Sequence, residues 1–277
     1  MMGKSFFENL ANRFSFFHAS TASDNLNAFP PMPEPLNTTE EKTPTKLSSQ
    51  SVHQKVSISK PQMEHIDSIP DTDVTFRMGF ATKPGLPIPH FPISHSAVCF
   101  QNEKTNKYSV IGRQSPFGIS LKYFSATTKV DDEDKYLHEG SKFDATMTDA
   151  RFTKQEIEQM VESADKHINK SQPCDMVRSN CYSNSTYMMA EALNILANRD
   201  NPPSQAAVQS IVKSIDEASK HHFSLGVRNN GVVHDKVTEA FESVRDYCDT
   251  YHQGIIDGYI DRRSDRYDDM MQDLFRP

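Results

Sequence analysis

The feature that most limits the fold is a pair of alternating apolar runs in residues 94–115, SHSAVCFQNEKTNKYSVIGRQS. Apolar and polar residues alternate with a period of two in both runs, as they do in strands that bury one face. The polar NEKTNK between the runs has the composition of a hairpin loop. These residues therefore predict two antiparallel strands joined by a short turn.

Strand patterns precede helix patterns along the chain. Order is expected to begin near Asp71, with a strand in DVTFRMGFATK, which is rich in β-branched and aromatic residues. The run GISLKYFSATTKV extends the sheet before the acidic break DDEDK. After this break the chain turns helical. Thr153 and Glu156 have the spacing of a capping box at the first helix start. Further helices are expected in SNSTYMMAEALNILANR, SQAAVQSIVKSIDEASKHH and VHDKVTEAFESVRDYCDTYHQGIIDGYIDRR. This order predicts an α+β fold, in which an antiparallel β-sheet packs against helices and a helical C-terminal extension follows.

Changes in composition divide the chain into four segments. Residues 1–22 form a short amphipathic segment, which would dock on a partner, on the body of the protein or on a membrane surface. Its apolar residues recur at helical spacing: Phe6, Leu10, Phe14 and Phe17. Residues 23–70 are rich in Pro, Ser and Thr and are interpreted as a disordered linker, because they bury too little apolar surface to offset their ordering entropy. Residues 71–200 form the α+β domain, and residues 201–277 form a helical extension that packs on it.

Composition and charge exclude several classes of function. A hydrophobic content of 36% suits a folded protein, and a net charge of -7 without a lysine-rich block argues against a nucleic-acid partner. No run approaches the roughly 20 apolar residues that span a bilayer. The N-terminus lacks the continuous apolar core of a signal peptide, and the four cysteines form no CxxC pair. We therefore expect a soluble, cytosolic protein of a reducing compartment.

One cysteine stands where a nucleophile is expected. Cys181 follows Ser179 and Asn180, two good helix-cap residues, and begins the helical pattern CYSNSTYMMAEAL. Unsatisfied N–H groups and the macrodipole at a helix N-terminus lower the pKa of a thiol, and the thiolate is its nucleophilic form. Free cysteine is also among the most buried residue types, so Cys181 is either a catalytic thiol or a core residue.

The hairpin contains the best candidate for a general base. His95 opens a strand on which it shares a face with Ala97 and Cys99, among apolar neighbours, whereas most of the 11 histidines lie in polar surroundings. Its alternative is a satisfied structural histidine.

Gln114 is the candidate for orienting His95. Pairing Gln101 with Tyr108 places Gln114 opposite His95 on the same face. A tighter turn places Pro116 opposite His95 and leaves Gln114 diagonal to it. A solvated strand residue is the alternative for Gln114.

Metal and phosphate sites have little support. Side chains of types that bind metal ions also occur together at His221, His222, His234 and Asp235, but they form no HExxH motif. The ten glycines form no GxGxxG motif and no P-loop. We therefore expect no metal and no cofactor.

Taken together, PHFPISHSAVCF, the hairpin after it and MVRSNCYSNSTYMMAEAL resemble the circularly permuted branch of the NlpC-type papain-like cysteine enzymes. That branch is similar in order to lecithin retinol acyltransferase, with a strand histidine, then a polar orienting residue on the next strand, then a cysteine on a helix after an NC step. The resemblance covers about residues 72–197. It implies a permuted papain-like fold with His95 as general base, Gln114 as orienting residue and Cys181 as nucleophile.

Acyl chemistry is what this resemblance implies. His95 would take the proton of Cys181, the thiolate would attack an amide, ester or thioester, and water or an amine would resolve the acyl-enzyme. Backbone N–H groups at Cys181 and Tyr182 would stabilise the oxyanion. The expected partner is a protein or lipid acyl substrate, and protease, amidase, deamidase and acyltransferase all remain open.

An interaction protein is the alternative, in which the helical half binds a partner protein while Cys181 and His95 are core residues. The order of leader, compact domain and helical extension is similar to effectors that bacteria inject into host cells, which implies a specialised secretion system and a host protein as target. A thiol probe separates the two functions, because it modifies a catalytic Cys181 faster than it modifies Cys99, Cys174 or Cys248.

Overall fold

The computed structural model describes residues 54–70, 74–88, 91–114, 129–132, 142–169, 179–220 and 230–261. The chain divides into two compact units, and almost all of the described residues belong to the second unit, Ser49–Pro87 with Pro92–Pro277. The predicted amphipathic segment, residues 1–22, and residues 23–53 of the predicted linker lie outside the described residues.

Within the described residues, six strands form one sheet in the order β1-β6-β2-β3-β4-β5. The strands are β1 (Gln54–Ser59), β2 (Thr75–Ile88), β3 (Phe91–Asn102), β4 (Tyr108–Gln114), β5 (Lys129–Asp132) and β6 (Lys142–Thr153). The pairings of β1 with β6, β6 with β2, β3 with β4 and β4 with β5 are antiparallel. The fold is therefore α+β, as the order of patterns predicts.

The hairpin of β3 and β4 is present in the first of the two predicted registers. Gln101 pairs with Tyr108, and Ala97 pairs with Gly112. Asn102 closes the turn, because its side-chain oxygen accepts hydrogen bonds from two backbone N–H groups of the loop. A polar loop side chain therefore helps to set which residues of β3 and β4 face one another.

The prediction of disorder is wrong for residues 54–70. β1 pairs with β6 along all 6 of its residues, and two short 3-10 helices follow at Lys60–Gln62 and Ile66–Ser68. Four apolar side chains of this segment are buried: Ile58, Met63, Ile66 and Ile69. The partners that bury them lie far away in sequence, so local composition gives little sign of this order.

A second difference between prediction and structure concerns β6. The acidic break DDEDK predicts a direct change from strand to helix. The sequence KFDATMTDARFT instead forms a strand whose first half alternates exposed and buried residues. The predicted strand GISLKYFSATTKV lies outside the described residues except for its last two, which begin β5.

The helices begin close to where their caps predict. They are α2 (Lys154–Ala164), α3 (Cys181–Ala197), α4 (Gln205–Lys220) and α6 (Gly231–Val244), with a further helix over residues 250–261. At the start of α2 the hydroxyl of Thr153 accepts the N–H of Glu156, and the Glu156 carboxylate accepts the N–H of Thr153. This is the predicted capping box.

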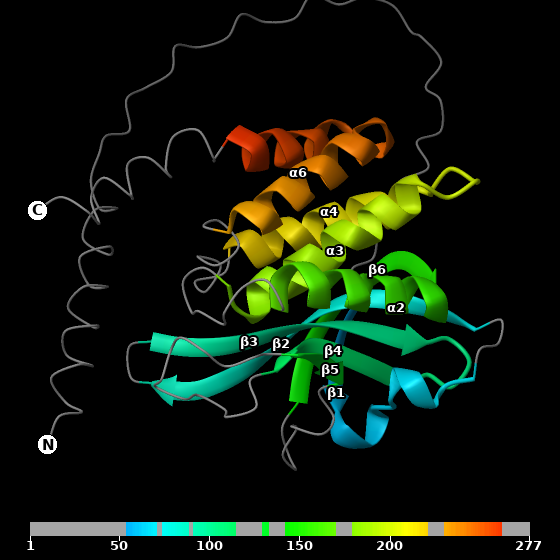
Figure 1. The fold of residues 1–277 in the computed structure, drawn as a ribbon, viewed down its shortest axis with the longest axis vertical. Coiled ribbons are helices and arrows are strands. Elements are labelled where there is room, and N and C mark those ends of the chain that lie inside the picture. Colours follow the sequence, from blue (N-terminus) through cyan, green and yellow to red (C-terminus); the bar gives the residue numbers. More distant parts are fainter. Residues whose placement is uncertain are drawn as a thin grey trace, which may run out of the picture. The chain divides into compact units, whose positions relative to one another are not determined.

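Helices pack on one face of the sheet, as Figure 1 shows. α3 contacts β4, α4 contacts β6, and α6 packs on α3 as an outer layer. A separate apolar core on the sheet contains Ile58 of β1, Cys99 of β3 and Phe143 of β6. The sheet is thus buried over much of its area, and the helical layer brings the start of α3 to the central strands.

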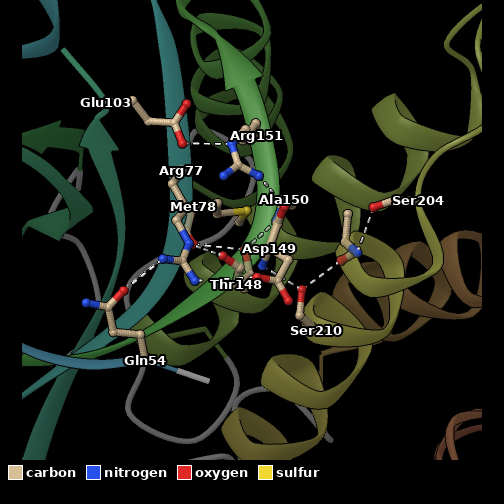
Figure 2. A network of polar contacts seen from close by, with 11 residues as sticks. Gln54, Arg77, Met78, Glu103, Thr148, Asp149, Ala150, Arg151, Ser204 and Ser210 are labelled. Atoms are coloured by element: carbon tan, nitrogen blue, oxygen red, sulfur yellow. Dashed lines mark hydrogen bonds and ion pairs between the residues drawn. The ribbon is translucent and has the colours of Figure 1, made fainter. Parts of the chain in front are cut away.

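A polar network joins β1, β2, β6 and α4, as Figure 2 shows. The Nε of Arg77 donates to the Thr148 carbonyl at 2.6 Å, and its Nη1 donates to Gln54 Oε1 at 2.9 Å. Its Nη2 lies 3.5 Å from Asp149 Oδ1, and the Asp149 backbone N–H donates to Ser210 Oγ on α4 at 3.0 Å. The network connects the edge of the sheet to the helical layer.

Gly79 provides a test of the close packing in the sheet. A Cβ atom at this position would lie 2.7 Å from Met147 Sδ and 2.8 Å from Cys99 Sγ. We expect Gly79→Ala to lower the free energy of unfolding by about 1–3 kcal/mol, because the core has no room for the methyl group. Urea denaturation measures this loss. Gly254→Ala is the matched control, since a Cβ there meets nothing within 4 Å, and equal stability of the two variants would contradict the packing.

Candidate active site

Cys181 is the first residue of α3, because Asn180 caps this helix. Asn180 Oδ1 accepts the N–H of Ser183 at 3.2 Å, and the Asn180 N–H donates to Ser183 Oγ at 3.2 Å. Nearly all of α3 is buried, whereas Cys181 retains partial exposure to solvent. The chain therefore presents a thiol at the N-terminus of a helix, at the edge of the solvent.

His95 and Cys181, the predicted base and nucleophile, are brought together. The side chain of His95 on β3 forms a hydrogen bond with the Cys181 thiol. The His95 ring also lies 6.3 Å from the ring of Phe143, which belongs to the apolar core that includes Cys99. His95 thus contacts both the start of α3 and the core of the sheet.

The surroundings of the Cys181 sulfur favour the thiolate. Burial raises the pKa of this thiol, but the charge of His95, a hydrogen bond from His95 and two hydrogen bonds from Ser96 all lower it. The net result is a pKa of Cys181 below the ordinary value. In contrast, burial raises the pKa of Cys99 to about 12 and that of Cys248 to about 11. Among these three cysteines, only Cys181 has the electrostatics of a nucleophile.

Two hydroxyl contacts tie the start of α3 to β3. Ser94 Oγ lies 2.5 Å from the Tyr182 hydroxyl, and Ser96 Oγ lies 3.3 Å from Ser185 Oγ. Tyr182 and Ser185 are fully buried, and the ring of Tyr182 also packs against Phe80 of β2. These contacts hold the helix start against the strand that carries His95.

Sequence reasoning missed two residues beside the thiol. The backbone and the side chain of Ser96 both form hydrogen bonds with the Cys181 sulfur. Arg113 of β4 is buried, and its Nη1 donates to Ser179 Oγ at the start of α3. The register carries a signal for both, because Ala97 pairs with Gly112 and the same register, continued by one residue, places Ser96 opposite Arg113. A charged residue in the alternating run of a buried strand is the sign that reasoning from the sequence passed over.

Gln114 ends β4, where it pairs with Lys129 of β5. The register of Ala97 with Gly112, continued by two residues, places Gln114 opposite His95. The Gln114 side chain lies outside the described part of the structure, so its contact with the imidazole stays a prediction.

The rival sites lie elsewhere. His234 stacks on Tyr259 with ring centroids 5.3 Å apart, and in the described residues no group of three or more His, Cys, Asp or Glu side chains is placed to hold a metal ion. His221 and His222 lie outside the described ranges. None of the helices that the structure describes combines the length and the apolar character that crossing a membrane requires.

A cavity of about 480 Å³ lies at the opposite end of α3 from Cys181, where Leu196 and Arg199 line it. A helix of 17 residues spans roughly 25 Å, so this cavity is remote from the thiol. Arg199 is paired with Glu156 at 2.9 Å, and Arg151 with Glu103 at 2.7 Å. These ion pairs give the charges around the cavity a structural role.

Comparison of the chain with protein-family models, with curated proteins and with solved structures gave no match. The argument for a function therefore depends on the residues around Cys181 and on their chemistry.

Thiol alkylation tests the electrostatics of the site. We expect iodoacetamide at pH 7 to modify Cys181 at least about tenfold faster than Cys99 or Cys248, because only Cys181 is partly exposed and has a lowered pKa. Mass spectrometry of proteolytic peptides measures each rate, including that of Cys174. The same reaction in urea is the control, since it should make the rates equal. Equal rates in the folded protein would contradict the description of Cys181 as an activated thiol.

Proposed function

We propose that this protein is a cysteine-nucleophile enzyme that acts on an amide, ester or thioester bond. Cys181 is the nucleophile and His95 is the general base. One observation carries this proposal: the hydrogen bond between His95 and a partly exposed thiol of lowered pKa at a helix N-terminus. The order of a strand histidine before a helix cysteine supports a permuted papain-like arrangement.

The reaction follows from the positions of these groups. His95 accepts the thiol proton, and the Cys181 thiolate forms a C–S bond to the carbonyl carbon of the substrate. The tetrahedral oxyanion is stabilised by backbone N–H groups at the start of α3, which the helix leaves available for an anion. His95 then gives its proton to the leaving amine, alcohol or thiol as the acyl-enzyme forms. Water or an amine attacks the acyl-enzyme, loses its proton to His95 and releases Cys181.

Comparison with Cys99 supports an enzyme over a pure interaction protein. Cys99 is a fully buried cysteine whose pKa is raised, as burial does to any structural thiol. Cys181 has the opposite shift and retains contact with solvent. A core role alone would require neither the histidine contact nor the exposure.

The substrate follows less directly from these contacts. A protein or lipid acyl group fits the chemistry, and hydrolysis, deamidation and acyl transfer share the same nucleophile and base. The effector-like order of segments supports a host protein as target after delivery by a specialised secretion system. This part of the proposal rests on analogy alone.

His95→Gln tests the general base. We expect the variant to slow acetylation of Cys181 by p-nitrophenyl acetate about 100-fold, because the proton acceptor is lost. Mass spectrometry measures the acetyl-enzyme. The midpoint of Cys181 alkylation against pH should also rise, because the charge and the hydrogen bond by which His95 lowers the thiol pKa are both lost. Wild-type acetylation with an unchanged midpoint, in a variant that melts as wild type does, would overturn the proposal.

Gln114→Ala tests the orienting residue. We expect it to fold normally and to reduce the acetylation rate of Cys181 by about an order of magnitude, because a misaligned imidazole is a poorer base. Gln101→Ala is the matched control, since Gln101 lies in the same hairpin and pairs with Tyr108 at its far end. Equal rates for the two variants across pH 6 to 9 would reduce the site to a dyad of Cys181 and His95.

A further inference from the structure

The Cys181 sulfur has a second neighbour that the proposed reaction does not use. Ser96 follows His95 on β3, and its backbone and its side chain both form hydrogen bonds with this sulfur. The Ser96 side chain is fully buried, so solvent does not compete for these bonds.

The hydrogen bond between Ser96 and Ser185 has a direction that the sulfur contact determines. The two hydroxyl oxygens lie 3.3 Å apart, and either one could donate by geometry alone. A serine hydroxyl has one proton and two acceptor lone pairs. A thiolate can only accept hydrogen bonds, so in the thiolate form Ser96 gives its proton to Cys181 and Ser185 is the donor to Ser96 Oγ. A relay therefore runs from Ser185 through Ser96 to the sulfur.

The position of Ser185 strengthens this assignment. Ser185 lies four residues after Cys181 on α3, one turn further along the same helix face. It is fully buried. The helix that carries the nucleophile thus also carries the group that orients the second donor to it, and the two move as one unit.

We propose that the Ser96 hydroxyl, oriented by Ser185, holds the Cys181 sulfur in its reactive position, which makes Ser96 a positioning residue beside His95. This inference rests on the proposed function and deepens it. Two kinds of donor then share the sulfur: His95 exchanges the proton, and Ser96 keeps its proton and stabilises the anion. A buried donor to an anion makes a stronger hydrogen bond than one to a neutral group, so Ser96 favours the thiolate over the thiol.

Several other charged and titratable groups lie near the sulfur. The groups around the start of α3 include His95 of β3, Arg113 of β4 and Tyr182 of α3 itself, with Lys83 over the Phe143 ring next to His95. Burial raises the pKa of Tyr182, so this phenol stays neutral over the pH range of the test.

Ser96→Ala tests the proposal because it removes the hydroxyl and keeps the backbone N–H. We expect the midpoint of Cys181 alkylation against pH to rise by about half a unit to one unit, which is a loss of about three- to tenfold in rate at pH 6. The rate at high pH, where the thiolate is fully formed, should change little. A merely structural serine would alter the melting temperature and leave the midpoint in place.

Two further variants complete the test. Ser185→Ala leaves the strand intact and removes only the donor to Ser96, so it should raise the same midpoint by a smaller amount. Ser214→Ala is the control, because Ser214 is a buried serine on α4 whose hydroxyl donates to the Ser210 carbonyl. It should leave the midpoint unchanged.

The outcomes separate this inference from the proposed function. A raised midpoint in Ser96→Ala and in Ser185→Ala, with Ser214→Ala at the wild-type value, supports the relay. A raised midpoint in His95→Gln alone overturns the role of Ser96 and keeps His95 as the base. Wild-type midpoints in all of these variants overturn both. If Ser96→Ala does not fold, Ser185→Ala decides, and its wild-type midpoint with a wild-type melting temperature overturns the relay.

Discussion

The contact between the start of α3 and strand β3 is the interaction on which the candidate site depends. It joins residues far apart in sequence, and it includes three polar contacts: Cys181 with His95, Tyr182 with Ser94, and Ser185 with Ser96. Each of these hydroxyl and sulfur contacts is directional, whereas apolar packing would allow the helix to slide or rotate by a few tenths of an ångström. These polar contacts therefore fix the distance and angle between the thiol and the imidazole.

These buried polar contacts lower the stability of the fold, because burying polar groups is unfavourable unless they are hydrogen-bonded. α3 buries four polar residues in succession, Ser183 to Thr186, in a part of the molecule where apolar side chains would pack more simply. Elsewhere the protein buries hydroxyls that bond only to their own helix, as Ser214 does on α4. At the start of α3 the hydroxyls of Tyr182 and Ser185 instead reach across to Ser94 and Ser96 of β3. Their concentration beside the one activated thiol of the described residues is the pattern of a site, in which geometry is maintained at the expense of stability.

Local signals made the hairpin and the helix starts predictable from the sequence. Alternation and loop length leave two registers for the hairpin, of which the structure has the one that pairs Gln101 with Tyr108. The caps at Thr153 and Asn180 come from side chains within three residues of the groups they bind. β1 and β6 were missed because their order depends on each other: Ile58 is buried against residues that lie far along the chain. Cys181 and His95 stood out by residue type. Ser96 did not, since a serine beside a histidine gains its role only from the helix that packs over it.

The register of β3 connects the hairpin loop to the candidate site. Asn102 organises the loop at one end of the hairpin, and the pairing of Ala97 with Gly112 transmits that alignment toward His95 and Ser96 at the other end. A slip of one residue would exchange the two faces of β3, so that Ser94 and Ser96 would turn away from α3 and the thiol would lose the hydroxyl of Ser96. The reactivity of Cys181 is in this sense a property of strand pairing. The helix N-terminus makes a thiolate favourable, but the alignment of the sheet decides which side chains meet it.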